Sequence, residues 1–346
     1  LITTLLFLPV LVVIGFIISR FSYLGTFLAL GLVTSGLLLI FVIKKPFWGI
    51  LLIIFTLPFE RIPTYDLGPI TIKMDQIFAG LTLLAAALKF FMDNKQRIIN
   101  PLIIPLILFI IIMLGSIIIS VDQTRALTVF VFTLFMILVS FIFPYLVDNQ
   151  EKLEKIIKIL FYSTLVVCIF GLYQFLGDVV GLPIALTGLK DIYTKAVLGF
   201  PRIQAFSMEP LYLANFLFIP LGISTSLYFF DQSKLFSKNK LLLVIALILI
   251  VIILGISRGA YIALGVMFLV FVIFLLRRVF TIKNILICVF SVLLIGGISY
   301  EFLKISRPDA LDQFSSHAKV EDFSQGESVQ KRLQDYQKAI DFWQTS

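Results

Sequence analysis

Charged residues are scarce in this sequence. Asp, Glu, Lys and Arg make up 14% of its 346 residues, whereas soluble domains carry about 25%. Hydrophobic residues make up 60%, and the mean hydropathy is +1.07. One globular core could not hide this much apolar surface, so we expect lipid to face most of it. The composition therefore excludes an ordinary water-soluble protein.

Histidine and cysteine are also rare, with one and two residues. Cys168 and Cys288 both lie inside apolar runs, where small buried side chains are expected. No group of His, Cys and carboxylates has the spacing of a metal site, and no phosphate-binding loop, dinucleotide fingerprint or nucleic-acid module occurs in the sequence. We therefore expect no metal, no cofactor and no nucleic acid partner.

Long apolar runs are abundant, and several reach the roughly 18 residues that cross a bilayer as a helix. A transmembrane β-barrel would show alternating segments of about ten residues instead. The expected fold class is an all-α polytopic membrane protein with about eleven transmembrane helices. We place these spans at residues 1–18, 21–43, 47–59, 74–92, 101–119, 125–147, 156–176, 210–230, 241–256, 259–276 and 284–303.

Basic residues between the spans alternate in density, and cytoplasmic loops of membrane proteins carry the excess of Lys and Arg. Fourteen fall in loops that we expect to be cytoplasmic: Lys44, Lys45, Lys89, Lys95, Arg97, Lys152, Lys155, Lys158, Lys234, Lys238, Lys240, Arg277, Arg278 and Lys283. Eight fall in loops that we expect to be external: Arg20, Arg61, Lys73, Arg125, Lys190, Lys195, Arg202 and Arg258. This predicts a cytoplasmic N-terminus, a transmembrane domain over 1–303, and an external segment over 304–346.

The basic residues of the predicted external loops are mostly arginines. Arginine presents a planar fork of donors that fits carboxylate and phosphate oxygens, whereas lysine is a hydrated point charge. We interpret this set as an indication of an anionic ligand at the external membrane surface. For each single arginine, the alternative is that its side chain only snorkels at a helix end.

The longest loop between two predicted spans, residues 177–209, is external and ends just before an apolar helix. It carries Arg202 and Glu209 near its end, and Tyr212 lies one turn beyond Glu209 on the same helical face. The Glu209 carboxylate could act as a general base or orient a hydroxyl. The simpler alternative is local: Ser207 caps the helix, and Glu209 and Pro210 belong to its first turn.

A second external feature is the short turn at Ser257-Arg258-Gly259, between two apolar spans. The glycine permits a tight turn. Arg258 has no acidic neighbour in the sequence, and at the lipid boundary such an arginine favours an anion as its partner.

The external segment also has an organised stretch. From residue 328 to residue 343, apolar side chains recur at spacings of three and four, which predicts an amphipathic helix. This helix is expected to lie on the outer leaflet or to cap an external cavity. The single histidine, His317, shows no partner pattern and is interpreted as a surface residue.

Three motifs follow one another on the predicted external side: residues 201–210 (PRIQAFSMEP), residues 257–260 (SRGA) and residues 332–340 (RLQDYQKAI). In their order and spacing they resemble the motifs of the O-antigen ligase and O-antigen polymerase family of bacterial envelope glycosyltransferases. Together with the number of spans, the resemblance covers most of the chain.

The resemblance implies a metal-independent enzyme with a GT-C-like architecture and about twelve spans, in the bacterial cytoplasmic (inner) membrane. Its substrates would be a polyprenyl-diphosphate-linked oligosaccharide and an acceptor glycan. By the matching motifs, Arg202 and Arg258 would hold the diphosphate, with Arg332 as a further substrate-binding residue. Tyr212 is predicted to bind substrate because it lies on the same helical face as Glu209. Glu209 would serve the acceptor hydroxyl.

The family pattern usually continues into a Pro- and Gly-rich segment, often preceded by a histidine, and then into the last spans. Here that histidine would fall near or beyond Ser346. Because the sequence starts at Leu1 and stops within a pattern, we expect both ends to be cut. The identity of the catalytic base stays open at this point.

The Glu209-Pro210 pair favours a polymerase of O-antigen-like repeat units over a ligase that transfers glycan to lipid A core. A transporter or flippase for an anionic lipid-linked substrate is the alternative from another class. Transporters place polar sites near the midplane, often in two repeated halves. In this sequence the ionisable residues gather at one face and no internal repeat is found, which favours the enzyme.

Overall fold

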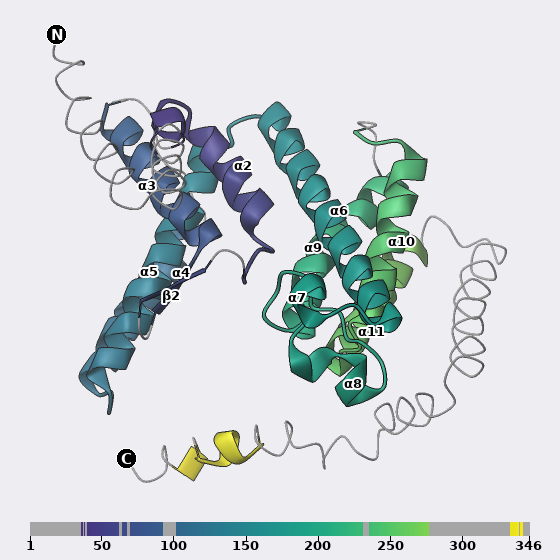
Figure 1. The fold of residues 1–346 in the computed structure, drawn as a ribbon. Coiled ribbons are helices and arrows are strands. Elements are labelled where there is room, and N and C mark those ends of the chain that lie inside the picture. Colours follow the sequence, from purple (N-terminus) through teal and green to yellow (C-terminus); the bar gives the residue numbers. More distant parts are fainter. Residues whose placement is uncertain are drawn as a thin grey trace, which may run out of the picture. The chain divides into compact units, whose positions relative to one another are not determined.

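The computed structural model describes residues 36, 38, 40–61, 64–67, 70–92, 102–230, 235–276, 333–338 and 340–341. The chain divides into two compact units, Leu1–Ser163 and Thr164–Ser346. Helix α6 (Gln150–Val180) contributes its first part to one unit and its second part to the other (Figure 1).

The first unit is built on helices α2, α3 and α5. Side chains from all three form its core, among them Ile50, Ala79 and Val139. At Gly49 an added Cβ would lie 2.0 Å from the hydroxyl oxygen of Thr82, so the glycine allows α2 and α3 to approach closely, as small residues do between membrane helices. The described elements of this unit before α6 are α2 (Pro46–Thr56), β1 (Thr64–Leu67), β2 (Ile70–Lys73), α3 (Met74–Met92), α4 (Ile103–Ile118) and α5 (Gln123–Leu146).

One short antiparallel hairpin, formed by β1 and β2, accompanies the helices of the described residues. Thr64 pairs with Lys73 at its open end, and Leu67 pairs with Ile70 at the turn. Both strands contain β-branched residues and are separated by a Gly-Pro dipeptide, a signal for a hairpin that hydropathy does not detect. An ion pair of 3.3 Å between Lys73 and Glu60 links the hairpin to the segment after α2.

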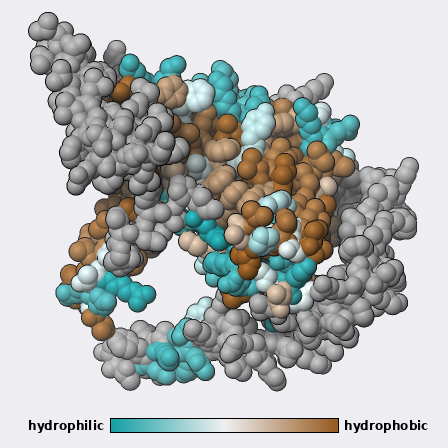
Figure 2. Space-filling view, viewed as in Figure 1, coloured by the Kyte–Doolittle hydropathy of each residue, from teal (hydrophilic) through white to brown (hydrophobic). Residues whose placement is uncertain are grey.

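Helix α4 shows how apolar the outer surface is. It packs on α5, yet none of its residues is buried. Ile112 is 69% exposed and Ile118 is 77% exposed, and hydrophobic residues also cover much of the visible surface in Figure 2. Because water would oppose such exposure, these side chains are suited to contact lipid.

The second unit packs α9 against α10 and α11. Its core includes Leu217 from α9 with Ile248 and Val251 from α10, all fully or almost fully buried. Between α6 and α9 the chain forms three short helices and then an irregular segment that ends at Glu209. The elements after α6 are α7 (Ile184–Thr187), η1 (Asp191–Tyr193), α8 (Lys195–Leu198), α9 (Pro210–Phe230), α10 (Lys238–Leu254) and α11 (Arg258–Leu276).

The helical class is confirmed for the described residues. Within them, α3, α5, α6 and α9 are long and apolar enough to cross a membrane, while α2, α4 and residues 258–271 of α11 are apolar but shorter. The predicted spans 74–92 and 210–230 coincide with α3 and α9. Helix α6 exceeds its predicted span of 156–176, so the loop expected from residue 177 begins after Val180 instead. The predicted spans 1–18 and 284–303 lie outside the described residues.

Candidate active site

The segment before α9 is folded by glycines and by a buried carboxylate. Gly188 and Gly199 end α7 and α8 with φ angles of 65° and 78°, a left-handed conformation that suits glycine at a helix C-terminus. The buried side chain of Asp178, near the end of α6, accepts a hydrogen bond of 2.7 Å from the backbone N–H of Lys195. The short helices are therefore fixed to the end of α6.

Two backbone hydrogen bonds then position Arg202. Its N–H donates to the carbonyl of Tyr193 at 2.8 Å, and the N–H of Ile203 donates to the carbonyl of Leu254 at 3.3 Å. Leu254 is the last residue of α10, and α11 begins at Arg258. The second bond therefore joins the motif around Arg202 to the turn before Arg258, although the two are far apart in the sequence.

The Arg202 guanidinium is half-buried and faces an aromatic ring. It lies 5.5 Å from the ring centre of Tyr193, within the range of a cation–π contact. Burial lowers the pKa of Arg202. The charges of Tyr193, Tyr261 and Glu209 raise this pKa, and the charge of Arg258 lowers it. Its Nε atom is buried and has no hydrogen-bond partner among the described residues. Such a donor is suited to an anionic oxygen.

The turn between α10 and α11 is short, as the sequence predicts, but it is made differently. Ile256 carries the positive φ, at 43°, which is an outlier for a β-branched residue. Gly259 lies in the first turn of α11, where an added Cβ would be 3.4 Å from Leu211 of α9. The Tyr261 hydroxyl donates to the Ile253 carbonyl at 2.7 Å and closes the turn. The expectation that Gly259 forms the turn is therefore wrong, because Gly259 already belongs to the helix that follows the turn.

Glu209 directly precedes the first residue of α9. The helix begins at Pro210, and the Glu209 carbonyl accepts from the N–H groups of Tyr212 and Leu213. Glu209 thus occupies the N-cap position that was expected for Ser207, which is 1% exposed and donates its N–H to the Gln204 carbonyl. Because Glu209 is exposed, its carboxylate remains accessible to a ligand.

Tyr193 connects these residues electrostatically. Burial raises the pKa of its hydroxyl, Glu209 raises it further, Arg202 lowers it, and Tyr212 raises it. Tyr212 is 45% exposed, on the first turn of α9. Arg202 therefore lies against the Tyr193 ring, while Glu209 and Tyr212 influence Tyr193, and Arg258 influences Arg202, through their charges.

Arg332, the remaining predicted site residue, lies outside the described residues. Next to it, residues 333–338 and 340–341 are helical, in agreement with the predicted amphipathic helix. Its apolar side chains Leu333 and Tyr336 are 56% and 68% exposed.

Sequence reasoning missed three residues of this region. Tyr261 lies one turn after Arg258 within the same motif, and its position alone could have indicated it. Gln174 is a buried amide inside an apolar span, and polar side chains in such places are expensive unless they have a partner. Tyr193 gave no sequence signal, because its contact depends on the fold of the preceding loop.

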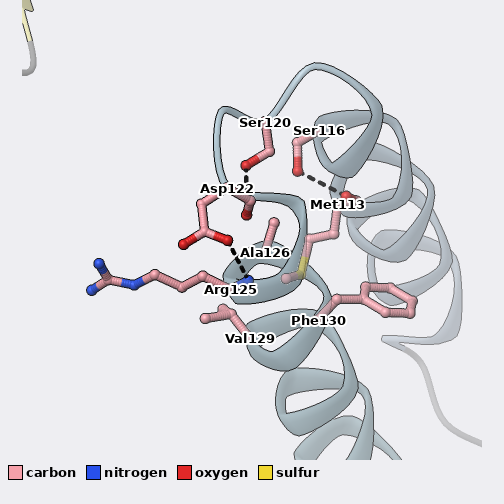
Figure 3. Close-up of a pocket in the computed structure, with 8 residues that line it drawn as sticks. All are labelled: Met113, Ser116, Ser120, Asp122, Arg125, Ala126, Val129 and Phe130. Carbon is pink, nitrogen blue, oxygen red and sulfur yellow. Dashed lines mark hydrogen bonds between the residues drawn. The ribbon is translucent and has the colours of Figure 1, made fainter. Parts of the chain in front are cut away.

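A separate pocket lies in the first unit, beside the turn between α4 and α5 (Figure 3). The Ser116 hydroxyl donates to the Met113 carbonyl, and the Ser120 hydroxyl donates to the Asp122 carbonyl. The Arg125 side chain extends away from Met113 and Ser116 in Figure 3. No predicted site residue lines this pocket, so it is not the candidate active site.

The candidate site can hold an anion and serve a hydroxyl. Arg202 lies in the loop before α9, Arg258 is the first residue of α11, and the exposed Glu209 directly precedes α9. The described residues contain no group of three or more His, Cys, Asp or Glu that could hold a metal ion. The guanidinium groups of Arg202 and Arg258 supply positive charge, which can stabilise developing negative charge in a preorganised site.

Comparison with known proteins gave one result. Residues 243–346 match a protein-family model described as O-Antigen ligase. No curated protein and no solved structure matches the chain. The matched range contains Arg258 and Arg332, while Arg202 and Glu209 precede it. The resemblance expected from the sequence is thereby confirmed over residues 243–346.

Proposed function

We propose that this chain, whose residues 243–346 match the O-antigen ligase family model, is a glycosyltransferase that polymerises a repeat-unit surface polysaccharide. The glycan would come from a polyprenyl diphosphate carrier and pass to the hydroxyl of an acceptor sugar. This transfer would take place at the external face of the bacterial cytoplasmic membrane.

The observation that carries the proposal is the backbone connection between the segments of Arg202 and Arg258. The Ile203–Leu254 hydrogen bond joins their two segments, and the charge of Arg258 acts on the pKa of Arg202. Two like charges that act on each other repel, and an anion that both can bind offsets this repulsion. A diphosphate has several oxygens that forked guanidinium donors can hold at once.

In the proposed reaction the acceptor oxygen attacks the anomeric carbon of the donor sugar. The new C–O bond forms as the bond to the diphosphate oxygen breaks, and that oxygen leaves with the electron pair. Arg202 and Arg258 stabilise the leaving diphosphate. Glu209 accepts the proton of the acceptor hydroxyl or orients that hydroxyl. Tyr212, exposed one turn along α9, would contact the acceptor sugar.

The membrane arrangement belongs to the same proposal. We place about eleven spans in this sequence, with the N-terminus in the cytoplasm and the loop before α9 and the segment 304–346 outside. A GT-C-like architecture follows from the family resemblance. The apolar helices of both units support the multi-pass arrangement.

Ligation to lipid A core is the second candidate, and the description of the matching family favours it. The preference for polymerisation rests on the Glu209-Pro210 pair, which lies outside the matched range. Both reactions need the same diphosphate site and differ only in their acceptor.

The test incubates the purified full-length protein with lipid-linked repeat units, with and without a lipid A core acceptor. Long polymer from the repeat units alone is the expected product. Glycan on lipid A core without polymer would replace polymerase by ligase. The absence of both products would overturn the proposed function.

A further inference from the structure

Gln174 of α6 makes an unusual pair of hydrogen bonds. Its Oε1 accepts from the N–H of Ala205 at 2.8 Å, and its Nε2 donates to the carbonyl of the same residue at 3.3 Å. The Gln174 side chain is fully buried. A buried amide is costly unless its donor and its acceptor are both satisfied, and here Ala205 satisfies both.

Ala205 is held in a conformation that alanine disfavours. Its φ angle is 47°, in the left-handed region where Cβ crowds the backbone. It lies in a β-turn that is closed by a hydrogen bond of 2.9 Å from the Ser207 N–H to the Gln204 carbonyl. Turns with a positive φ at this position usually contain glycine. An alanine here needs contacts from outside the turn.

Other residues of α6 fit the same segment. The ring of Phe170 stacks on that of Phe206 with centres 4.2 Å apart and planes 9° apart. At Gly171 an added Cβ would lie 2.9 Å from the Ile203 side chain. One face of α6 therefore contacts residues 203–206, between Arg202 and Glu209.

We propose that Gln174 is a positioning residue that sets Arg202 and Glu209 relative to each other by holding the Ala205 turn. This inference rests on the proposed function, because it assigns the turn a role in binding the lipid-linked donor. A primary amide presents a donor and an acceptor side by side, so it can bind the N–H and the carbonyl of one residue. A methionine fills similar space but can hold neither backbone group.

The experiment compares four variants of the full-length protein: Gln174→Met, Ala205→Gly, the two combined, and Cys168→Ala as a matched control. Cys168 is also fully buried on α6, so its truncation measures the effect of a packing defect alone. Two quantities are measured in each variant. They are the kcat and KM for a lipid-linked repeat unit, and the rate of amide hydrogen exchange over residues 199–209.

Gln174→Met should raise KM for the donor by about tenfold, because two hydrogen bonds that position the turn are lost. Exchange over residues 199–209 should become faster. Ala205→Gly alone should change KM by less than about twofold, since glycine adopts the positive φ without strain. In the combined variant the glycine should recover part of the lost affinity. The Cys168→Ala control should leave KM unchanged even if it lowers Tm.

An unchanged KM in Gln174→Met would overturn the inference, because a purely structural residue alters the amount of folded enzyme and not its affinity. If the wild type transfers no glycan, the proposed function fails and hydrogen exchange decides the rest. Exchange over 199–209 that does not respond to Gln174→Met would then show that the amide does not hold the turn.

Discussion

Arg125 and Arg202, which are predicted to lie on the same side of the membrane, have very different surroundings. Arg125 lies in the first turn of α5, where its N–H donates to the Asp122 side chain at 2.9 Å and the surrounding turn is closed by local contacts. The segment around Arg202 is held by residues far away in sequence, including Gln174 and Leu254. The cap at Asp122 binds the backbone of residue 125, so it does not require an arginine side chain at that position. We interpret a segment that is ordered by distant partners and carries a positive φ as a candidate functional position.

Replacing Arg258 and Arg125 in turn should give the largest difference. Arg258→Ala should reduce polymer formation by at least about 100-fold, because one of two donors to the leaving diphosphate is lost. Arg125→Ala should change it by less than about twofold, since an exposed arginine in a local turn contributes little. Polymer length on gels and the amount of protein in the membrane are measured for both variants.

Arg258→Lys sharpens the same comparison. Lysine keeps the charge but not the fork, so it should recover little of the lost activity. If the wild type, Arg258→Ala and Arg125→Ala formed equal amounts of polymer, Arg258 would be no more important for the reaction than Arg125, which would contradict the proposed diphosphate site.

Glu209→Gln should have the next largest effect. Loss of a general base typically lowers kcat by about 100-fold or more, while KM for the donor should change little because the carboxylate serves the acceptor. Initial rates at saturating donor provide the measurement. Glu60→Gln is the control, since Glu60 belongs to the first unit, where it pairs with Lys73. A similar decrease in both variants would argue against a catalytic role.

Glycine-to-alanine changes should separate the two regions by stability. Gly171→Ala places a Cβ 2.9 Å from the Ile203 side chain, and such overpacking costs about 1 to 3 kcal/mol. Gly115→Ala in α4 meets nothing within 4 Å, so it should be neutral or should stabilise its helix by up to about 1 kcal/mol. Thermal unfolding in detergent measures both. A lower Tm for Gly115→Ala than for Gly171→Ala would contradict the packing described for α6.

Ala205→Gly should have the smallest effect on activity. Relief of the left-handed alanine should raise stability by about 1 kcal/mol, and the turn should keep its shape through Gln174. Unfolding in detergent and the initial transfer rate are measured together. A large loss of activity would mean that the methyl group of Ala205, and not the turn, is what the site needs.

The sequence was informative where a property repeats along the chain. The apolar runs predicted α3 and α9 at their observed positions. The motifs around Arg202 and Arg258 lie in segments that the Ile203–Leu254 hydrogen bond joins, and their role in one site stays a prediction. The hairpin at Thr64–Lys73 escaped because each strand has only four residues. The pairing of Gln174 with Ala205 escaped for another reason. Periodicity shows that residue 174 lies in a helix, but no local pattern indicates which distant backbone it will bind.

The central claim is that Arg202 and Arg258 form one anion site, and binding of a polyprenyl diphosphate to the purified protein tests it most directly. Each single alanine variant should weaken binding by at least about tenfold, and the double variant should lose less than the two losses combined, as coupled residues do. Arg125→Ala should bind as the wild type does. Unchanged affinity in Arg202→Ala or Arg258→Ala, or fully independent losses in the double variant, would contradict a shared site.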